Sequence, residues 1–169
     1  MWPRPRRRLF PDLRTMPTLR PSRPQDGARV IDIWRRAVDA THHFLAPADR
    51  QALDAEVSAL LPAAPLRLAV DADDVPQAFM WVVDGQLEAL FVDPAQHGRG
   101  LGRRLVEQAL REHPHLRTDV NAQNPQALAF YTRLGFVETG RSPLDGQGRA
   151  YPLVHLRHAG APTAEDAAA

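Results

Sequence analysis

The residues best suited to chemistry lie in a glycine-rich loop between a short apolar run and an amphipathic segment. Gly98, Gly100 and Gly102 stand at alternate positions, and arginines lie among and directly after them. A helix N-terminus leaves backbone N–H groups unpaired, and its dipole favours negative charge. Glycine lets a ligand approach such a backbone without obstruction by a Cβ atom. The loop therefore predicts a phosphate or pyrophosphate site.

Two common phosphate-binding motifs do not fit this loop. A Walker A motif needs a lysine, and all 21 basic residues of the chain are arginine. The dinucleotide motif G-x-G-x-x-G begins correctly at Gly98 and Gly100, but Arg103 occupies the position of its third glycine. The pattern that fits is H-x-x-G-x-G, which starts at His97.

A second motif lies downstream, between Asn121 and Phe136. Its spacing is N-x-x-N-x-x-A-x-x-F-Y-x-x-x-G-F. Both motifs resemble those of the GCN5-related N-acetyltransferase (GNAT) superfamily, in which the first is Q/R-x-x-G-x-G/A and wraps the pyrophosphate of acetyl-CoA. His97 replaces the usual Gln or Arg, a change of little consequence if backbone N–H groups bind the ligand.

Four further segments narrow the resemblance to the YjaB-type bacterial acetyltransferases. They are residues 33–45, 60–66, 90–94 and 139–153, and the similarity extends over residues 18–158. This resemblance implies direct transfer of acetyl from acetyl-CoA to an amine in a ternary complex, with a peptide or protein lysine as a possible acceptor. A small-molecule amine remains an alternative, as does a module that binds acetyl-CoA without significant catalysis.

The resemblance implies an α+β fold with a mostly antiparallel, twisted sheet of about seven strands, splayed at the coenzyme cleft and flanked by about four helices. Hydrophobic periodicity and turn residues agree with that order. We expect helices over residues 26–38, 48–61, 101–113 and 125–134, the first of them capped by Asp26. We expect strands over residues 18–20, 67–70, 77–83, 86–92, 116–121, 136–141 and 150–157.

Composition indicates one domain and excludes several classes of function. The chain has 169 residues and no cysteine, which excludes disulfides and thiolate metal sites. Its histidines are scattered, so no metal site is expected. No apolar run could span a bilayer, and we expect a cytoplasmic protein without a membrane partner. A homodimer is possible for this fold, although no sequence feature indicates one.

The two ends of the chain differ from the domain between them. Residues 1–16 are rich in proline and arginine and predict a disordered basic extension. Residues 17–158 form the acetyltransferase domain, and the small residues of 159–169 predict a flexible tail. The extension could bind an anionic surface, but a nucleic-acid partner is unlikely because the rest of the chain is net acidic.

The resemblance also implies a set of coenzyme-binding residues. Asn124 would hydrogen-bond the pantetheine arm, and Arg103 would reach the pyrophosphate, whereas Arg104 would face solvent or the ribose 3′-phosphate. Arg133 could also meet the 3′-phosphate, with a solvated helix face as the alternative. The full predicted set is Leu90, Phe91, Val92, His97, Gly98, Arg99, Gly100, Leu101, Gly102, Arg103, Asn121, Asn124, Ala127, Tyr131 and Arg133.

Acetyl transfer to an amine requires a neutral nucleophile, a polarised thioester and a proton for the departing thiolate. Tyr131 is the predicted acid, because the resemblance places it beside the coenzyme sulfur. The backbone of residues 90–92 is expected to polarise the carbonyl, next to a strand bulge. Glu88 is the predicted base, acting directly or through water, and an exposed strand carboxylate is the alternative.

Four other residues are predicted to line the acceptor pocket. His42 and His43 lie between the first two expected helices, and at most one of them is expected to face the cleft. Tyr151 and His155 are expected on one face of the last strand, where they line the pocket or pack beneath it. Either histidine of the first pair could also serve as the base.

Overall fold

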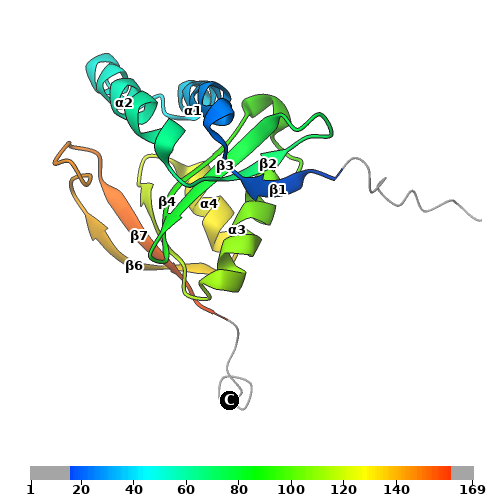
Figure 1. Ribbon diagram of the computed structural model, residues 1–169. Coiled ribbons are helices and arrows are strands. Elements are labelled where there is room, and N and C mark those ends of the chain that lie inside the picture. Colours follow the sequence, from blue (N-terminus) through cyan, green and yellow to red (C-terminus); the bar gives the residue numbers. More distant parts are fainter. Residues whose placement is uncertain (1–15, 161–169) are drawn as a thin grey trace, which may run out of the picture.

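The computed structural model describes residues 16–160. The extension and the tail predicted from the sequence lie outside this range, apart from Met16, Ala159 and Gly160. Seven strands form one sheet in the order β1-β2-β3-β4-β5-β7-β6 (Figure 1). Their bounds are β1 Thr18–Pro21, β2 Arg67–Val70, β3 Pro76–Val83, β4 Gln86–Val92, β5 Arg117–Asn121, β6 Phe136–Ser142 and β7 Leu153–His158.

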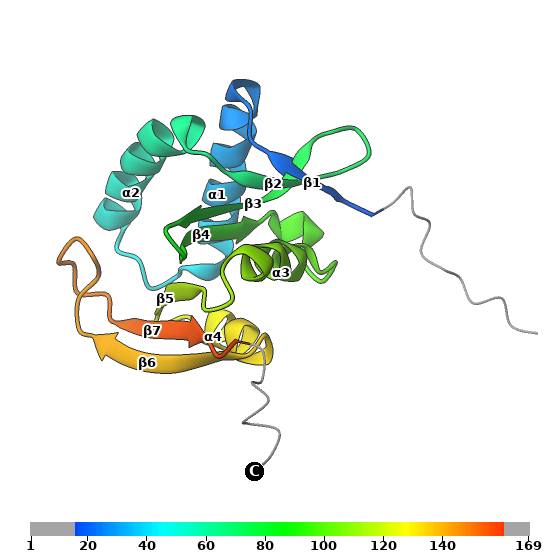
Figure 2. The ribbon, with the colours of Figure 1, turned by 60° about the horizontal axis from the view of Figure 1, so that its bottom comes forward.

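Four α-helices flank the sheet, as the sequence predicted. They are α1 Gly27–Thr41, α2 Pro47–Leu60, α3 Leu101–Glu112 and α4 Pro125–Arg133. Three short 3-10 segments, η1 Pro24–Asp26, η2 Leu61–Ala63 and η3 Pro94–Gln96, join them to their neighbours. α1 packs on β3 and β4 with α2 beside it, whereas α3 and α4 cover the opposite face (Figure 2).

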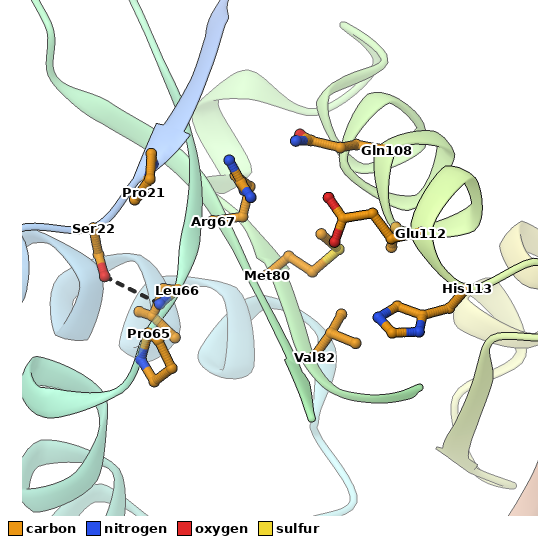
Figure 3. Close-up of a pocket in the computed structure, with 11 residues that line it drawn as sticks. Pro21, Ser22, Pro65, Leu66, Arg67, Met80, Val82, Gln108, Glu112 and His113 are labelled. Carbon is orange, nitrogen blue, oxygen red and sulfur yellow. Dashed lines mark hydrogen bonds between the residues drawn. The ribbon is translucent and has the colours of Figure 1, made fainter. Parts of the chain in front are cut away.

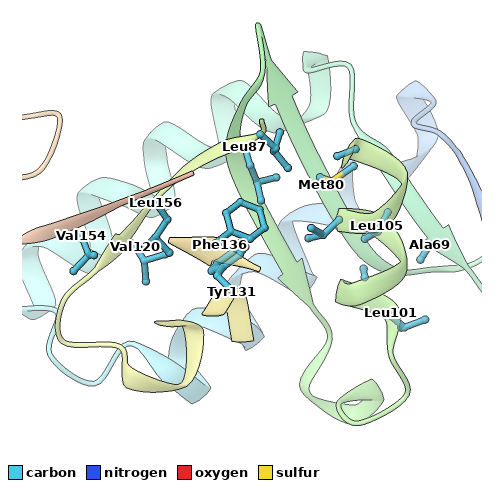
Figure 4. Close-up of a cluster of buried hydrophobic side chains, with 14 residues drawn as sticks. Ala69, Met80, Leu87, Leu101, Leu105, Val120, Tyr131, Phe136, Val154 and Leu156 are labelled. Carbon is cyan, nitrogen blue, oxygen red and sulfur yellow. The ribbon is translucent and has the colours of Figure 1, made fainter. Parts of the chain in front are cut away.

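Each face of the sheet has its own hydrophobic core. On the α3 side, Leu105 and Leu116 are fully buried in a cluster that also contains Tyr131 (Figure 4). On the α1 side, Ile33 and Phe79 are fully buried in a second cluster. Burying one such side chain contributes about 1.5–3 kcal/mol, so both helix layers are firmly held to the sheet.

β4 and β5 are parallel neighbours that pair over only a short length. The register joins Gln86 to Arg117 and Leu87 to Thr118, and no later residue of β4 pairs with β5. From this point the two strands separate, which leaves the carboxyl-terminal part of β4 without a partner on that side. The splayed sheet that the family resemblance implied is therefore present.

A bulge in β4 lies at the point where the strands separate. Trp81 of β3 pairs with Ala89 and the next residue of β3 pairs with Leu87, so Glu88 is the extra residue. Leu87 packs in the cluster beneath α3, whereas Ala89 packs in the cluster beneath α1. In a regular strand these two side chains would share one face, so the bulge reverses the alternation of β4.

Two local expectations were wrong. The Asp26 side chain does not cap the first helix, because its carboxylate accepts hydrogen bonds from the Arg23 backbone and from the Arg20 guanidinium at 2.8 Å. The last strand begins at Leu153, three residues later than expected, so Tyr151 lies before the strand. The partners of Asp26 lie three and six residues earlier in the chain, whereas Tyr151 binds Asp49, 102 residues earlier.

Candidate active site

A cleft of about 410 Å³ opens where β4 and β5 separate. Its walls come from the carboxyl-terminal part of β4, the glycine loop, the first turn of α3, and α4, with the end of α1 above them. Most of the predicted coenzyme residues line it, namely Leu90, Phe91, Val92, His97, Gly98, Gly100, Leu101, Gly102, Arg103, Asn124, Ala127, Tyr131 and Arg133. Arg99 and Asn121 do not line it.

The glycine loop is built to receive a ligand. Gly98 and Gly100 adopt left-handed conformations with φ of 78° and 75°, and a Cβ on either would meet nothing within 4 Å. The backbone N–H groups of residues 98–103 have no hydrogen-bond partner among residues 16–160. Open space beside a row of unpaired donors suits a pyrophosphate, so the residues present fit the coenzyme implied by the sequence.

The arginines near this loop have different partners. Arg103 lines the cleft and pairs with Glu107 at 2.7 Å, with two thirds of its side chain exposed. Arg104 instead donates to the Pro17 carbonyl at 2.5 Å and so fastens α3 to the segment before β1. The expectation that Arg104 faces solvent or a 3′-phosphate was therefore wrong. Arg133, at the end of α4, lines the cleft and is exposed.

Tyr131 lies on α4, where it lines the cleft and packs in the core beneath α3. It is 7% exposed and packs edge-on against Phe130 and Phe136. Burial raises the pKa of its hydroxyl well above the ordinary value, and a hydrogen bond with Thr118 only partly opposes that shift. The hydroxyl therefore keeps its proton across the physiological pH range, which is the state required of an acid.

The two asparagines of the second motif shape the loop between β5 and α4. The Asn121 side-chain oxygen accepts from the Gln123 backbone N–H at 2.8 Å, and that of Asn124 accepts from the Ala127 N–H at 3.1 Å. Asn124 thereby caps α4. Asn124 also lines the cleft, and because its side-chain oxygen already accepts a hydrogen bond, its amide N–H groups are the part that can bind a ligand there.

The two histidines after α1 face different surroundings. His42 lines the cleft, whereas His43 is exposed and lines a separate hollow with Phe44. Burial, followed by the neighbouring His43, lowers the pKa of His42. Thr41 donates its hydroxyl proton to the Ala37 carbonyl at 2.7 Å and so accepts from His42 Nδ1, also at 2.7 Å. In the neutral ring, Nε2 is therefore unprotonated.

The remaining predicted residues lie on the α1 face of the sheet or at its edge. Glu88 is exposed at the bulge and does not line the cleft. Tyr151 donates to Asp49 at 2.5 Å and accepts from the Ala46 N–H at 3.0 Å, which ties the β6–β7 loop to α2. Tyr151 thus forms a wall of this region rather than part of a strand face.

His155 has partners that sequence reasoning missed. Its Nδ1 lies 2.6 Å from Asp119 Oδ1, and its Nε2 lies 2.7 Å from Ser142 Oγ. Asp119 and Ser142 come from β5 and β6, the two neighbours of β7. Only the register of the strands could have indicated this grouping, because the residues are far apart along the chain.

Asp93, at the end of β4, is a second residue whose partners the sequence did not reveal. Its carboxylate is 1% exposed and accepts from Arg29 at 2.5 Å, from Arg36 at 2.7 Å and from the Ala95 N–H at 2.9 Å. Burial raises its pKa, but these donors outweigh burial and hold the pKa below the ordinary value. Asp93 therefore fastens α1 to the end of β4 and positions the start of the glycine loop.

A further hollow of about 290 Å³ lies on the other half of α3 (Figure 3). Arg67, Glu112 and His113 surround it, with Met80 and Val82 below, and no predicted site residue lines it. Residues 16–160 contain no group of three or more potential metal ligands. Within the described residues, no helix is long and apolar enough to cross a membrane.

The chain is similar to proteins of one family. Residues 70–150 match the family model described as "Acetyltransferase (GNAT) domain". A protein of Salmonella typhimurium named "Peptidyl-lysine N-acetyltransferase YjaB" is 49% identical over 141 residues, 83% of this chain and 97% of that protein. The solution structure of apo YjaB from Escherichia coli superposes with a TM-score of 0.82 at 46% identity, covering 86% of this chain and 99% of that one.

These similarities and the cleft identify the class of protein. The chain belongs to the GNAT acetyltransferase family, and it is an N-acetyltransferase that uses acetyl-CoA. Within that family it is similar to the YjaB proteins over nearly their whole length. The predicted family and fold are thus confirmed.

Proposed function

We propose that this protein transfers acetyl from acetyl-CoA to the ε-amine of a lysine in a peptide or protein, by direct attack in a ternary complex. The observation that carries the proposal is the cleft itself, which joins the backbone donors of residues 98–103, unpaired within residues 16–160, to a buried tyrosine where β4 and β5 separate. The name of the Salmonella relative supports lysine as the acceptor.

Several groups of the chain bind and orient the coenzyme in this proposal. The N–H groups of residues 98–103 bind the pyrophosphate, and Arg103 and Arg133 add positive charge at the cleft mouth. The unpaired edge of β4 over residues 90–92 binds the pantetheine arm, together with the Asn124 amide. Acetyl-CoA, when bound, supplies the acetyl group as a thioester.

Tyr131 and Glu88 occupy the two sides of the splay in this proposal. Tyr131 holds a proton on its buried hydroxyl and gives it to the sulfur that leaves. Glu88 is exposed at the bulge, where its carboxylate attracts a cationic amine and can take up a proton through water. His42, His43 and Tyr151 line the approach to this point.

An acetylation assay with matched peptides tests the proposal. The protein is mixed with acetyl-CoA and a lysine peptide, or with the same peptide carrying arginine, and free thiol and peptide mass are followed together. We expect one thiol per acetylated lysine and no acetylated arginine peptide. Faster turnover of free lysine or a simple alkylamine than of the peptide would contradict the peptide acceptor. Binding of acetyl-CoA without turnover of any amine would contradict catalysis.

A further inference from the structure

Three polar side chains form a continuous hydrogen-bond chain on the face of the sheet that α3 and α4 leave open. Asp119 Oδ1 lies 2.6 Å from His155 Nδ1, and His155 Nε2 lies 2.7 Å from Ser142 Oγ. They belong to the adjacent strands β5, β7 and β6. Asp119 and His155 face each other directly in the strand register.

The chemistry of these groups fixes the direction of the hydrogen bonds. An ionised carboxylate only accepts, so His155 Nδ1 carries the proton that points at Asp119. In the neutral ring Nε2 is then an acceptor, and the Ser142 hydroxyl must donate to it. A serine hydroxyl held in this way can receive a proton from outside while it passes its own to the ring.

The Asp119–His155–Ser142 hydrogen-bond chain lies where β4 and β5 separate. Thr118 is the last residue of β5 that pairs with β4, and Asp119 follows it directly. Val120 packs in the core that contains Tyr131, so Asp119 and His155 face the opposite side of the sheet. The predicted acid and this chain therefore flank the same opening from its two faces.

The Asp119–His155–Ser142 hydrogen-bond chain is accessible and has charged neighbours of both signs. The side chains of His155 and Asp119 are 33% and 43% exposed. Gly140 of β6 lies opposite His155, and a Cβ there would be 3.7 Å from the ring, so position 140 places no side chain over it. Glu88 on β4 lies on this face, as does Gln86, whose amide lies 3.4 Å from Asp119 Oδ2. Arg117 and Arg157 lie there too, because they pair with each other two residues away from Asp119 and His155.

We propose that Ser142, His155 and Asp119, rather than Glu88, form the proton relay that deprotonates the acceptor amine, while Glu88 attracts the cationic amine. This inference rests on the proposed function. One N–H bond of the ammonium breaks and its proton passes to Ser142 Oγ, while the Ser142 proton passes to His155 Nε2. The imidazolium that forms is stabilised by Asp119 and later releases its proton to water. Ser142 is the catalytic residue that touches the amine, and Asp119 is a positioning residue.

The test compares amines of different basicity in His155→Asn, Ser142→Ala and Ser142→Thr. Two peptides are used that are identical except for lysine or its less basic analogue S-aminoethylcysteine. At neutral pH we expect His155→Asn and Ser142→Ala to lower kcat/KM for the lysine peptide about 10²-fold. Ser142→Thr should restore most of the rate because it keeps a hydroxyl.

The loss should depend on the amine, which a merely structural defect would not produce. It should shrink with the less basic amine, and also as the pH rises toward the lysine pKa of about 10.4, because less deprotonation is then required. Acetyl-CoA affinity should stay unchanged in each variant. His115→Asn, which replaces an exposed histidine in the turn before β5, is the matched control and should behave as the wild type.

Each contrary result has a defined meaning. An equal loss with both peptides at every pH, or no loss in His155→Asn, would overturn the relay. A basicity-dependent loss in His42→Asn instead of His155→Asn would overturn it as well. Failure of the wild type to acetylate either peptide would overturn the proposed lysine acceptor, and the same variants would then be compared with alkylamines of graded pKa.

Discussion

Gly100→Ala, compared with Gly148→Ala, separates backbone strain from coenzyme binding. Both glycines have left-handed backbones, with φ of 75° and 78°, and a Cβ on either meets nothing within 4 Å. Gly100 precedes α3 in the cleft, whereas Gly148 lies in the β6–β7 loop. The two substitutions therefore impose the same local strain at two unrelated places.

The cost of each substitution can be worked out from the backbone. A left-handed residue with a Cβ costs about 1–2 kcal/mol. The more restricted unfolded chain of alanine returns about 0.4–1 kcal/mol. The free energy of unfolding should thus fall by about 1 kcal/mol in both variants, which lowers Tm by about 2–4 °C.

The coenzyme affinity should distinguish the two variants. A Cβ at position 100 would occupy part of the open space beside the loop whose N–H groups at residues 98–103 are unpaired within the described residues, so Gly100→Ala should raise the Kd for acetyl-CoA at least tenfold, about 1.4 kcal/mol. Gly148→Ala should leave the Kd unchanged. Calorimetric titration and thermal unfolding of both proteins measure these quantities. Equal Kd values for the two variants, at equal losses of stability, would refute the assignment of the loop.

Three other changes test separate parts of the site. Tyr131→Phe should lower kcat about 10²-fold without changing the Kd for acetyl-CoA, because the buried hydroxyl acts on the leaving sulfur; an unchanged kcat in steady-state assays would refute this role. Asp93→Asn should cost about 2 kcal/mol in denaturant unfolding, since Asp93 is buried while its arginine partners are 24% and 46% exposed. The pKa of Asp93 is lowered in the folded protein, so its contribution to the free energy of unfolding is complete above the ordinary value of 3.8 and is lost as the pH falls through the folded pKa. A difference in unfolding free energy between wild type and variant that stayed constant below pH 3.8 would contradict this. Arg104→Gln should leave the Kd for acetyl-CoA unchanged, because Arg104 donates to Pro17, and a weaker Kd would place this arginine on the coenzyme.

The order of helices and strands was predictable because turn residues and helix-terminal residues mark it locally in the sequence. Asp84 and Gly85 mark a tight turn, and both have positive φ as a two-residue hairpin turn requires. Pro47 opens α2, and Gly135 follows α4 with φ of 92°. These features depend on residues a few positions apart, so periodicity and turn chemistry reveal them without the fold.

The partners of polar side chains were not predictable in the same way. Asp93 binds arginines 57 and 64 residues earlier in the chain, and Asp119 binds a histidine 36 residues later. Asp26 was expected to cap a helix because aspartate often does, but Arg20 offered a stronger partner. Competition among several possible donors is decided by strand register and helix packing, which a single sequence does not contain.

The bulge at Glu88 illustrates the same limit within one strand. The sequence of β4 ends in four apolar residues, 89–92, and does not reveal an extra residue; the family resemblance alone implied a bulge in this region. The strand pairing places the extra residue at Glu88 and reverses which side chains face α1. The reversal puts Ala89 and Phe91 on the α1 side, a placement that simple alternation from Leu87 would not give.

Backbone amide NMR during titration with acetyl-CoA would show directly where the coenzyme binds. We expect the largest shifts at the N–H groups of residues 98–103, with further shifts at residues 90–92 and at Asn124. The residues around the other α3 hollow, including Arg67 and Glu112, should stay unshifted. Shifts that gather around that hollow, or that spare the glycine loop, would contradict the account.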